Sequence, residues 1–314
     1  MEMNNHSAIA EFILVGLSSA PEQQIIIFWA FAFIYAVALA GNFLLILAIG
    51  TCSKLHTPMY FLLVNLSIVN MCSISITVPK MLQNLLTAQK TISFSACIVQ
   101  VFLFVWALGT EILLLSFMAF DRYAAICQPL HYMVIMKKEV CIGIAAGVWI
   151  MGMVNSAVHA GLLLKLTFCS SHIMNHFFCD LPPLWKLSCS DISLNETMAF
   201  SADVTFTMSS CALTFISYLL ILRTIFTIQS VKGKKKAFST CSSHLLVVSF
   251  YFSTIIYTYA KPSSANDLEE YKSVAIIYSV VTPVLNPIIY SLRNKEVKEA
   301  LAKLICRIWS SQHE

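Results

Sequence analysis

The sequence predicts an all-α membrane protein, a bundle of seven transmembrane helices followed by a short amphipathic helix. Hydrophobic residues make up 58% of the 314 residues and charged residues only 11%, whereas soluble domains carry about 25% charged residues. The stretch from Cys97 to Cys127 is apolar over a length that exceeds the ~30 Å hydrocarbon core at ~1.5 Å per helical residue. Most lysines and arginines also fall on one side of a seven-span arrangement, as the positive-inside rule requires.

The uneven placement of basic residues predicts the orientation and the boundaries. Because lysine and arginine stay on the cytoplasmic side, we expect an extracellular N-terminus and a cytoplasmic C-terminus in a multi-pass plasma-membrane protein. An extracellular tail is expected at 1–24, the bundle at 25–292, and a cytoplasmic amphipathic helix with its tail at 293–314. The spans are expected at about 25–49, 58–81, 97–127, 139–164, 198–226, 237–259 and 271–292, with an extracellular loop at 165–197.

Single residues in the first two spans predict a contact between helices and the bounds of the second helix. Asn42 in the first span is expected to hydrogen-bond across helices. The second helix is expected to begin at Pro58, because proline at the first helical position loses no hydrogen bond, and to end near Met81. Outside the membrane, Asn5 and Asn195 each begin an acceptor triplet for N-glycosylation, of which Asn195 is the weaker candidate.

The third span carries charges at membrane depth. Glu111 and Arg122 are eleven residues apart, close to three turns at ~3.6 residues each, so they project from nearly the same face. A charged group at this depth is costly unless it faces the protein interior. In a plainer interpretation of Asp121-Arg122-Tyr123, the arginine only snorkels to the lipid headgroups.

Four cysteines lie on the predicted extracellular side, where disulfides persist: Cys97, Cys169, Cys179 and Cys189. Four cysteines permit three pairings. A bridge between the loop at 165–197 and the third helix would hold the loop as a lid over the bundle, because it removes loop entropy.

The last three spans carry isolated polar groups and prolines. Asp203 either snorkels or bonds a neighbouring hydroxyl, or else it faces a pocket and selects ligands with a hydrogen-bond donor. His244 is either a satisfied interior residue, or else a switch or a contact between helices. Pro283 and Pro287 each remove a backbone donor and are expected to kink the seventh helix.

A small, mostly apolar pocket is expected in the outer half of the bundle, suited to small volatile molecules. The same side chains also fit simple packing between helices, and the pattern does not separate the two for any one residue. The candidates besides Asp203 are Val101, Phe104, Val105, Leu108, Ile112, Phe206, Tyr251, Thr254, Ile255, Thr258 and Ser279.

Five motifs that span nearly the whole chain resemble those of one family. They are Leu55-His-Thr-Pro-Met-Tyr-Phe61, Met118-Ala-Phe-Asp-Arg-Tyr-Ala-Ala-Ile-Cys127 with the following Gln128-Pro-Leu-His-Tyr132, Ser217-Tyr218, Lys236-Ala-Phe-Ser-Thr-Cys-Ser-Ser-His-Leu245 and Pro283-Val-Leu-Asn-Pro-Ile-Ile-Tyr-Ser-Leu-Arg-Asn294. The sequence resembles the olfactory (odorant) receptors of the tetrapod type, class II, which are rhodopsin-like G-protein-coupled receptors.

This resemblance implies a function, its partners and two disulfides. A small volatile odorant is expected to activate a heterotrimeric stimulatory olfactory G protein and raise cyclic AMP. The implied pairs are Cys97 with Cys179 and Cys169 with Cys189. The residues implied in activation or coupling are Asp121, Arg122, Tyr123, Tyr218, Lys236, His244, Asn286, Pro287 and Tyr290.

Asn70 departs from the family pattern, in which most relatives carry an aspartate that would bind sodium together with the acid of the third helix. Glu111 is then the only carboxylate left at that position. Because a hard cation prefers charged oxygen ligands, we expect sodium binding to be weak or absent and Glu111 to be partly protonated.

The motifs of common catalytic and cofactor sites are missing from the sequence, so neither an enzyme, nor a cofactor, nor nucleic-acid binding is expected. The serious alternative is a seven-span transporter or proton pump that uses Glu111, Asp203 and His244 as a relay. The chain lacks the internal repeat that many transporters have. An apolar membrane scaffold would leave the Asp-Arg-Tyr motif unexplained.

Overall fold

Long apolar runs form the helices of the bundle. The computed structural model describes residues 10–18, 20–169, 172–260 and 267–310, without the side chains of residues 203, 236, 240, 255–260, 267–270, 292, 293 and 305–310. Its main helices are α1 (Pro21–Thr51), α2 (Pro58–Leu86), α3 (Phe94–Cys127), α5 (Lys138–Leu163), α7 (Ser193–Asp203) continued by α8 (Ser209–Thr227), α9 (Val231–Ala260), and α10 (Asp267–Ile276) continued by α11 (Thr282–Arg293).

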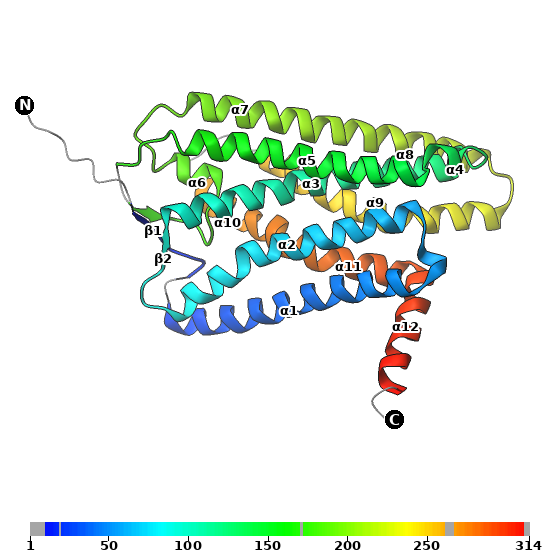
Figure 1. Cartoon of the computed structure of the whole chain (residues 1–314), viewed down its shortest axis with the longest axis horizontal. Helices are drawn as coiled ribbons and strands as arrows, with labels where there is room; N and C mark the ends of the chain where they lie inside the picture. The colour runs from blue at the N-terminus through cyan, green and yellow to red at the C-terminus, as the bar shows by residue number, and fades with distance from the viewer. Residues whose placement is uncertain (1–9, 19, 170–171, 261–266, 311–314) are drawn as a thin grey trace, which may run out of the picture.

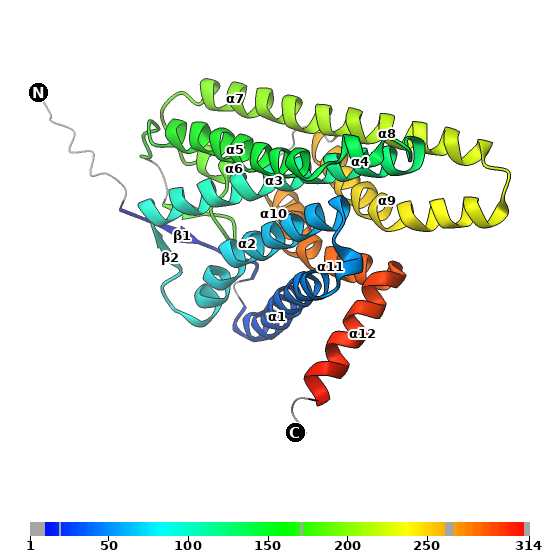
Figure 2. The same cartoon turned by 45° about the vertical axis from the view of Figure 1, so that its right-hand side comes forward.

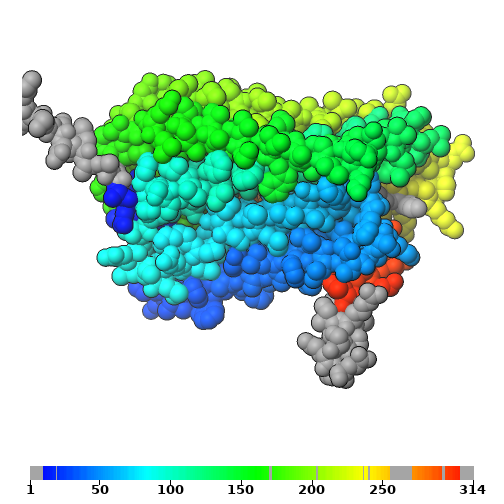
Figure 3. Space-filling view, in the orientation of Figure 1, coloured from blue at the N-terminus to red at the C-terminus, as the bar shows by residue number. Residues whose placement is uncertain are grey.

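These helices confirm the predicted fold class. Six segments of the described chain are long and apolar enough to cross a membrane, and α9, which is more polar because of its lysines and serines, completes the bundle. The helices lie side by side along one direction (Figures 1 and 2). Their side chains fill the space between neighbours on the face that Figure 3 shows, which α1, α2, α3 and α5 form.

Helix α3 lies at the centre of the packing. It contacts α2, α5, α8 and α9, and it is buried along most of its length, including the charged Glu111, Asp121 and Arg122. Its contact with α5 is close because Gly152 has no side chain. A Cβ at this position would lie 2.6 Å from the Thr110 hydroxyl oxygen, so a larger residue there would push the two helices apart.

Several boundaries differ from those expected. Helix α2 continues past Pro79 to Leu86 instead of ending near Met81, because a single proline removes only one backbone donor. Between residues 1 and 24, where a polar tail was expected, the strand β1 (Glu11–Leu14) forms and α1 begins at Pro21.

Strand β1 is the middle strand of a small sheet at the end of the bundle that carries the N-terminus (Figure 1). It pairs antiparallel with β2 (Thr91–Ser93) and parallel with β3 (Ile173–Met174). Phe12 and Leu14 alternate inward and are fully buried. They pack in an apolar cluster with Cys97, Val101 and Cys179, so the sheet covers the outer end of α3.

At the opposite end, α12 (Lys295–Ser310) leaves the bundle at an angle (Figure 1). Val297 and Ala300 on its inner face are buried. The Tyr60 hydroxyl of α2 donates to Glu296 at 2.9 Å and accepts from the Asn294 amide at 2.8 Å. These contacts fix the helix start against the bundle, in agreement with the amphipathic pattern of its sequence.

Candidate ligand cavity and Arg122 cluster

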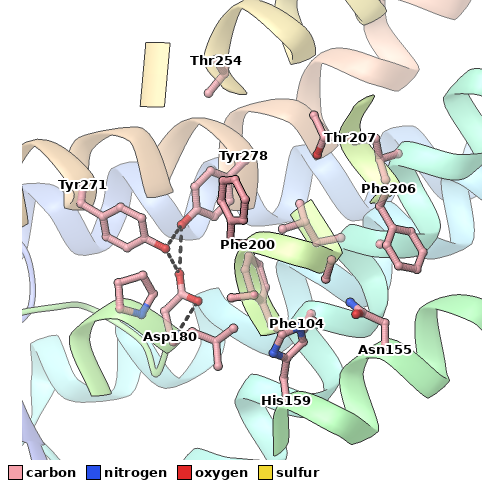
Figure 4. Close-up of a pocket in the computed structure, with 18 of the residues that line it drawn as sticks. Phe104, Asn155, His159, Asp180, Phe200, Phe206, Thr207, Thr254, Tyr271 and Tyr278 are labelled. Atoms are coloured by element: carbon pink, nitrogen blue, oxygen red, sulfur yellow. Dashed lines mark hydrogen bonds between the residues drawn. The ribbon is translucent and has the colours of Figure 1, made fainter. Parts of the chain in front are cut away.

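A cavity of about 690 Å³ lies among α3, α5, α7, α9 and α10, on the side of the bundle that carries the disulfides. Figure 4 shows its side chains converging from these helices. Aromatic and aliphatic groups dominate the lining, with polar groups at separate points. The lining residues are Phe104, Val105, Leu108, Gly109, Ile112, Asn155, His159, Asp180, Leu181, Pro182, Trp185, Glu196, Ala199, Phe200, Ala202, Phe206, Thr207, Tyr251, Thr254, Tyr271, Tyr278 and Thr282.

Most of the described pocket candidates from the sequence line this cavity. They are Phe104, Val105, Leu108, Ile112, Phe206, Tyr251 and Thr254. Two candidates are corrected. Val101 lies one turn too far outward and packs under the sheet beside Phe12, and the buried Ser279 hydroxyl donates to the Ala275 carbonyl of its own helix at 2.6 Å. The side chains of Asp203, Ile255 and Thr258 lie outside the described residues.

Sequence reasoning missed the loop residues that close the cavity. The Asp180 carboxylate accepts the Leu181 backbone N–H at 2.8 Å and so caps the short helix α6 (Leu181–Trp185). Its other oxygen accepts the hydroxyls of Tyr271 at 2.7 Å and Tyr278 at 3.0 Å. An aspartate directly before Leu-Pro-Pro is a helix-start signal that would have located α6.

Two π-helical turns interrupt the helices beside the cavity. Val204–Met208 joins α7 to α8, and Ile277–Val281 joins α10 to α11. Each turn contributes lining residues, among them Phe206 and Tyr278. Such turns rotate the side chains that follow them relative to a regular helix, so periodicity alone does not predict which residues of these segments face inward.

One disulfide ties the loop at 165–197 to α3, and a second joins two residues within the loop. Cys97 of α3 is bonded to Cys179, and Cys169 is bonded to Cys189, the pairs that the family resemblance implies. Beside the first bridge, the Gln100 side chain accepts the Cys179 backbone N–H and donates to the Ile76 carbonyl, both at 2.8 Å. The loop is therefore fixed to α2 and α3 at one point.

His176 lies in the same loop and is fully buried. Its ring stacks on Phe177, and its Nδ1 lies 2.9 Å from the Phe178 carbonyl oxygen, to which an N–H there donates. Burial lowers the pKa of His176 below its usual value, against the opposing charge of Asp180. The ring is therefore neutral at physiological pH.

A chain of polar side chains crosses the middle of the bundle. The Asn42 amide donates to the Pro283 carbonyl at 2.9 Å, and the Asn70 amide donates to Asn42 at 3.2 Å. The Asn286 amide lies 3.2 Å from the Asn70 oxygen and 3.4 Å from the Glu111 carboxylate. Glu111 is the one carboxylate in this chain of contacts. Within the described residues there is no group of three or more histidine, cysteine, aspartate or glutamate side chains that could hold a metal ion.

A second polar cluster surrounds Arg122, at the end of α3 opposite the Cys97 disulfide. Arg122 is only 8% exposed, and it is close enough to Tyr218, His244 and Tyr290 for its charge to act on them. Asp121 accepts a hydrogen bond from Tyr132 at 2.8 Å. Tyr132 begins the short helix α4 (Tyr132–Ile135), so this contact ties the loop after α3 to the Asp-Arg-Tyr motif.

His244 joins three helices. Its Nε2 lies 3.0 Å from the Leu115 carbonyl oxygen of α3, which only accepts, so this nitrogen carries the proton. Its Nδ1 then accepts the Tyr218 hydroxyl of α8 at 2.7 Å. The ring is fully buried, and Tyr218 stacks against it. His244 is therefore an interior residue with both ring nitrogens hydrogen-bonded, and its bonds form a contact between helices.

The other predicted site residues are Pro287, Tyr123, Asn195, Asn5 and Lys236. Pro287 lies inside α11 and is buried, while Tyr123 is half-buried on α3. Asn195 is only 5% exposed, and a buried amide is a poor glycan acceptor. Asn5 and the side chain of Lys236 lie outside the described residues.

The relay imagined for a transporter has no continuous path among the described side chains. Glu111 contacts Asn286 of α11. His244 bonds Tyr218 and Leu115 instead. The two groups therefore belong to separate polar clusters, and the side chain of Asp203 is not described.

Comparisons with known proteins agree with the motifs. The family model described as "Olfactory receptor" matches residues 31–308. Olfactory receptor 13G1 of Homo sapiens is 47% identical over 300 residues, which cover 96% of this chain and 98% of the relative. Olfactory receptor 2B6 of Mus musculus is 44% identical over 313 residues, which cover 100% of both chains. The chain therefore belongs to the olfactory receptor family, as the sequence predicted, and is a multi-pass membrane protein that binds odorants and signals through G proteins.

Proposed function

We propose that this receptor binds small, mostly apolar odorants in the cavity between α3, α5, α7, α9 and α10, and that binding activates the stimulatory olfactory G protein and raises cyclic AMP. The observation that carries the proposal is the position of the cavity, which is lined largely by apolar groups and covered by a disulfide-linked loop. Burial of a small apolar molecule there gains about 0.8 kcal/mol per CH₂ group. As a member of its family the chain is a receptor and not an enzyme.

The residues proposed for activation are those around Arg122. In this arrangement Arg122 is buried, and α9 is tied to α3 and α8 through His244, so the cytoplasmic end is closed. A ligand shifts such an equilibrium only if it binds one arrangement better than the other. We infer that an odorant favours an arrangement in which α9 moves outward and exposes Arg122 to the G protein.

A patch of exposed apolar residues supports coupling at the same end. Leu130 is 92% exposed, and Met133 and Val134 of α4 are 74% and 71% exposed. Apolar groups exposed together outside the membrane-spanning helices mark interaction sites. Because Tyr132 between them hydrogen-bonds Asp121, a partner bound to this patch would contact the segment that holds the Asp-Arg-Tyr motif.

The proposed orientation places the disulfide end outside the cell. Disulfides persist in oxidising compartments, and β1 brings the N-terminal segment to the same end. The lysines at the start of α9 lie at the other end, where the positive-inside rule expects them. We therefore propose an extracellular N-terminus and a cytoplasmic C-terminus in the plasma membrane.

A panel of chemically diverse odorants, applied to cells that express the full chain with the stimulatory olfactory G protein, tests this function. Cyclic AMP should rise in a dose-dependent manner with at least one compound. With that agonist, Arg122→Ala should abolish signalling while leaving ligand binding largely intact, and the exposed Lys303→Ala of α12 serves as the control. Equal loss of binding and signalling in Arg122→Ala, or solute transport in place of cyclic AMP, would count against the proposal.

A further inference from the structure

The cavity contains two polar side chains of α5 that the rest of the fold leaves unpaired. His159 is only 5% exposed and Asn155 is half-buried. Both line the cavity, and Figure 4 shows both projecting into it from α5. Neither side chain hydrogen-bonds to any part of the chain that the structure describes. Four residues separate them, so they lie on the same face of the helix, one turn apart.

Asp180 and Thr282, two other polar residues of the cavity, are already engaged, and the Trp185 indole N–H, which is buried without a partner among the described residues, offers a donor alone. Both oxygens of Asp180 accept hydrogen bonds, from the Leu181 backbone and from Tyr271 and Tyr278. The Thr282 hydroxyl donates to the Ile277 carbonyl at 3.1 Å. A ligand would have to displace these contacts to bond the same atoms. His159 and Asn155 offer a donor and an acceptor each without such a loss.

The position of the pair is set by the close contact of α3 and α5. Gly152 lies against Trp106 and Thr110 of α3, and the Ser156 hydroxyl donates to the Phe102 carbonyl. These contacts fix the rotation of α5 within one turn of Asn155 and His159. Polar groups held on a rigid helix orient a ligand more strictly than groups on a loop.

Charge in the lining restricts the ligand further. Asp180 and Glu196 are the charged residues among the described lining, and both are acidic. A carboxylate ligand would enter a largely apolar space next to these like charges, with no lysine or arginine of the described lining to compensate. A neutral head group avoids both penalties.

Resting on the proposed odorant-binding function, we propose that His159 and Asn155 are the specificity-determining polar subsite of the cavity, which hydrogen-bonds the hydroxyl or carbonyl group of a neutral odorant. A hydroxyl group donates to one ring nitrogen or amide oxygen and accepts from the neighbouring N–H, so alcohols match the pair best. Aldehydes and ketones use only the donors. Acids are excluded, and hydrocarbons of the same shape bind without this contribution.

The test is a matched panel applied to cells that express the full chain, with cyclic AMP as the readout. Each of several carbon skeletons, for example a linear eight-carbon chain, a cyclohexyl ring and a phenylethyl group, is supplied as hydrocarbon, alcohol, carbonyl compound, amine and carboxylic acid. We expect alcohols to act at about tenfold lower concentrations than the matched hydrocarbon, the value of about one net hydrogen bond. Acids should be inactive.

Variants of His159 locate the effect. His159→Phe keeps a ring of similar size and should raise the half-maximal concentration of alcohols about tenfold, while that of hydrocarbons changes less than about twofold. His159→Gln keeps a donor and an acceptor and should restore part of the preference. Val158→Phe places the same ring on the exposed face of α5, where Val158 is 39% exposed. It should change the half-maximal concentration of neither the alcohols nor the hydrocarbons. Surface staining of every variant corrects for poor folding.

The outcomes that overturn the inference are distinct from failure of the receptor function. Activation by acids, or an alcohol-to-hydrocarbon ratio unchanged in His159→Phe, overturns it while odorant signalling stands. A preference for amines that is lost in Asp180→Asn places the polar subsite at Asp180 and overturns it too. If no compound of any class raises cyclic AMP at normal surface expression, the proposed function itself fails, and this inference fails with it.

Discussion

His244→Phe should raise signalling in the absence of odorant. The substitution removes two buried hydrogen bonds, from the Tyr218 hydroxyl at 2.7 Å and to the Leu115 carbonyl at 3.0 Å. Each contributes about 1 kcal/mol net, so the closed arrangement loses about 2 kcal/mol relative to one in which α9 has moved away from α3. This changes the equilibrium constant about 30-fold.

Basal cyclic AMP per receptor at the cell surface is the assay. Tyr218→Phe breaks only one of the two bonds and should produce a smaller rise, about fivefold for ~1 kcal/mol. The double variant should add little to His244→Phe, because both substitutions remove the same bond. Leu245→Phe, on the adjacent outward position that is 37% exposed, is the matched control. Unchanged or lower basal activity of His244→Phe at normal surface expression would refute the reasoning.

Three further outcomes are expected. Exchange of sodium for choline should leave signalling nearly unchanged, whereas Asn70→Asp adds a second carboxylate near Glu111 and should create sodium inhibition at millimolar concentrations. The folded protein lowers the pKa of His176. Its contribution to stability is therefore complete above the pKa of about 6.5 in the unfolded chain, and is lost as the pH falls below that value. Acidification should lower the melting temperature less in His176→Phe than in the unaltered receptor. Gly152→Val should destabilise the receptor by about 1–3 kcal/mol, because the new Cβ would lie 2.6 Å from the Thr110 hydroxyl oxygen of α3. Gly147→Val serves as the control, because a Cβ at that position has no neighbour within 4 Å.

Each of these expectations has a contrary result. Strong sodium inhibition of the unaltered receptor would mean that Glu111 and the surrounding amides suffice for a hard cation. Equal acid sensitivity of His176→Phe and the unaltered receptor would assign that sensitivity to another group. Equal thermal stability and surface expression of the Gly152 and Gly147 variants would show that α3 and α5 separate at little cost.

The helices were predictable because each span is a long apolar run whose signal is local. The strand β1 was not, because Glu11–Leu14 is only four residues long and its partners, β2 and β3, lie far along the chain. Its alternation of buried Phe12 and Leu14 with exposed neighbours is visible in the sequence, but four residues of alternation also occur by chance in a loop. The end of α2 was misplaced for a different reason, since Pro79 looks like a terminator and is tolerated inside the helix.

The lining residues of α3 were predictable from the sequence, whereas several lining residues of the neighbouring helices were not. The 3.6-residue period placed Phe104, Leu108 and Ile112 on one face, and this face lines the cavity, because α3 is a regular helix buried on several sides. Tyr278 was missed because a π-helical turn shifts the period. His159 was missed because which face of α5 turns toward the cavity depends on the close contact at Gly152, a tertiary feature without a local sequence signal.

The cavity and the polar cluster around Arg122 are joined through two helices. Ile112 lines the cavity, and the carbonyl of Leu115, about one turn further along α3, binds His244. Thr282 also lines the cavity, and Asn286, one turn further along α11, contacts Glu111. A ligand that shifts α3 relative to α11 therefore acts directly on hydrogen bonds that hold the closed arrangement.

Such hydrogen bonds rearrange by exchanging partners, because a buried polar group left unpaired costs about 1–3 kcal/mol. The structure contains candidates for the exchange. Among the described residues, Arg122 Nε and the Tyr290 hydroxyl are buried without a hydrogen-bond partner, and both lie close to Tyr218. If α9 moves outward and His244 releases the Tyr218 hydroxyl, that hydroxyl has new partners within the bundle. The lost bonds are then partly replaced, which lowers the free energy that differential binding of an odorant must supply to reach the open arrangement.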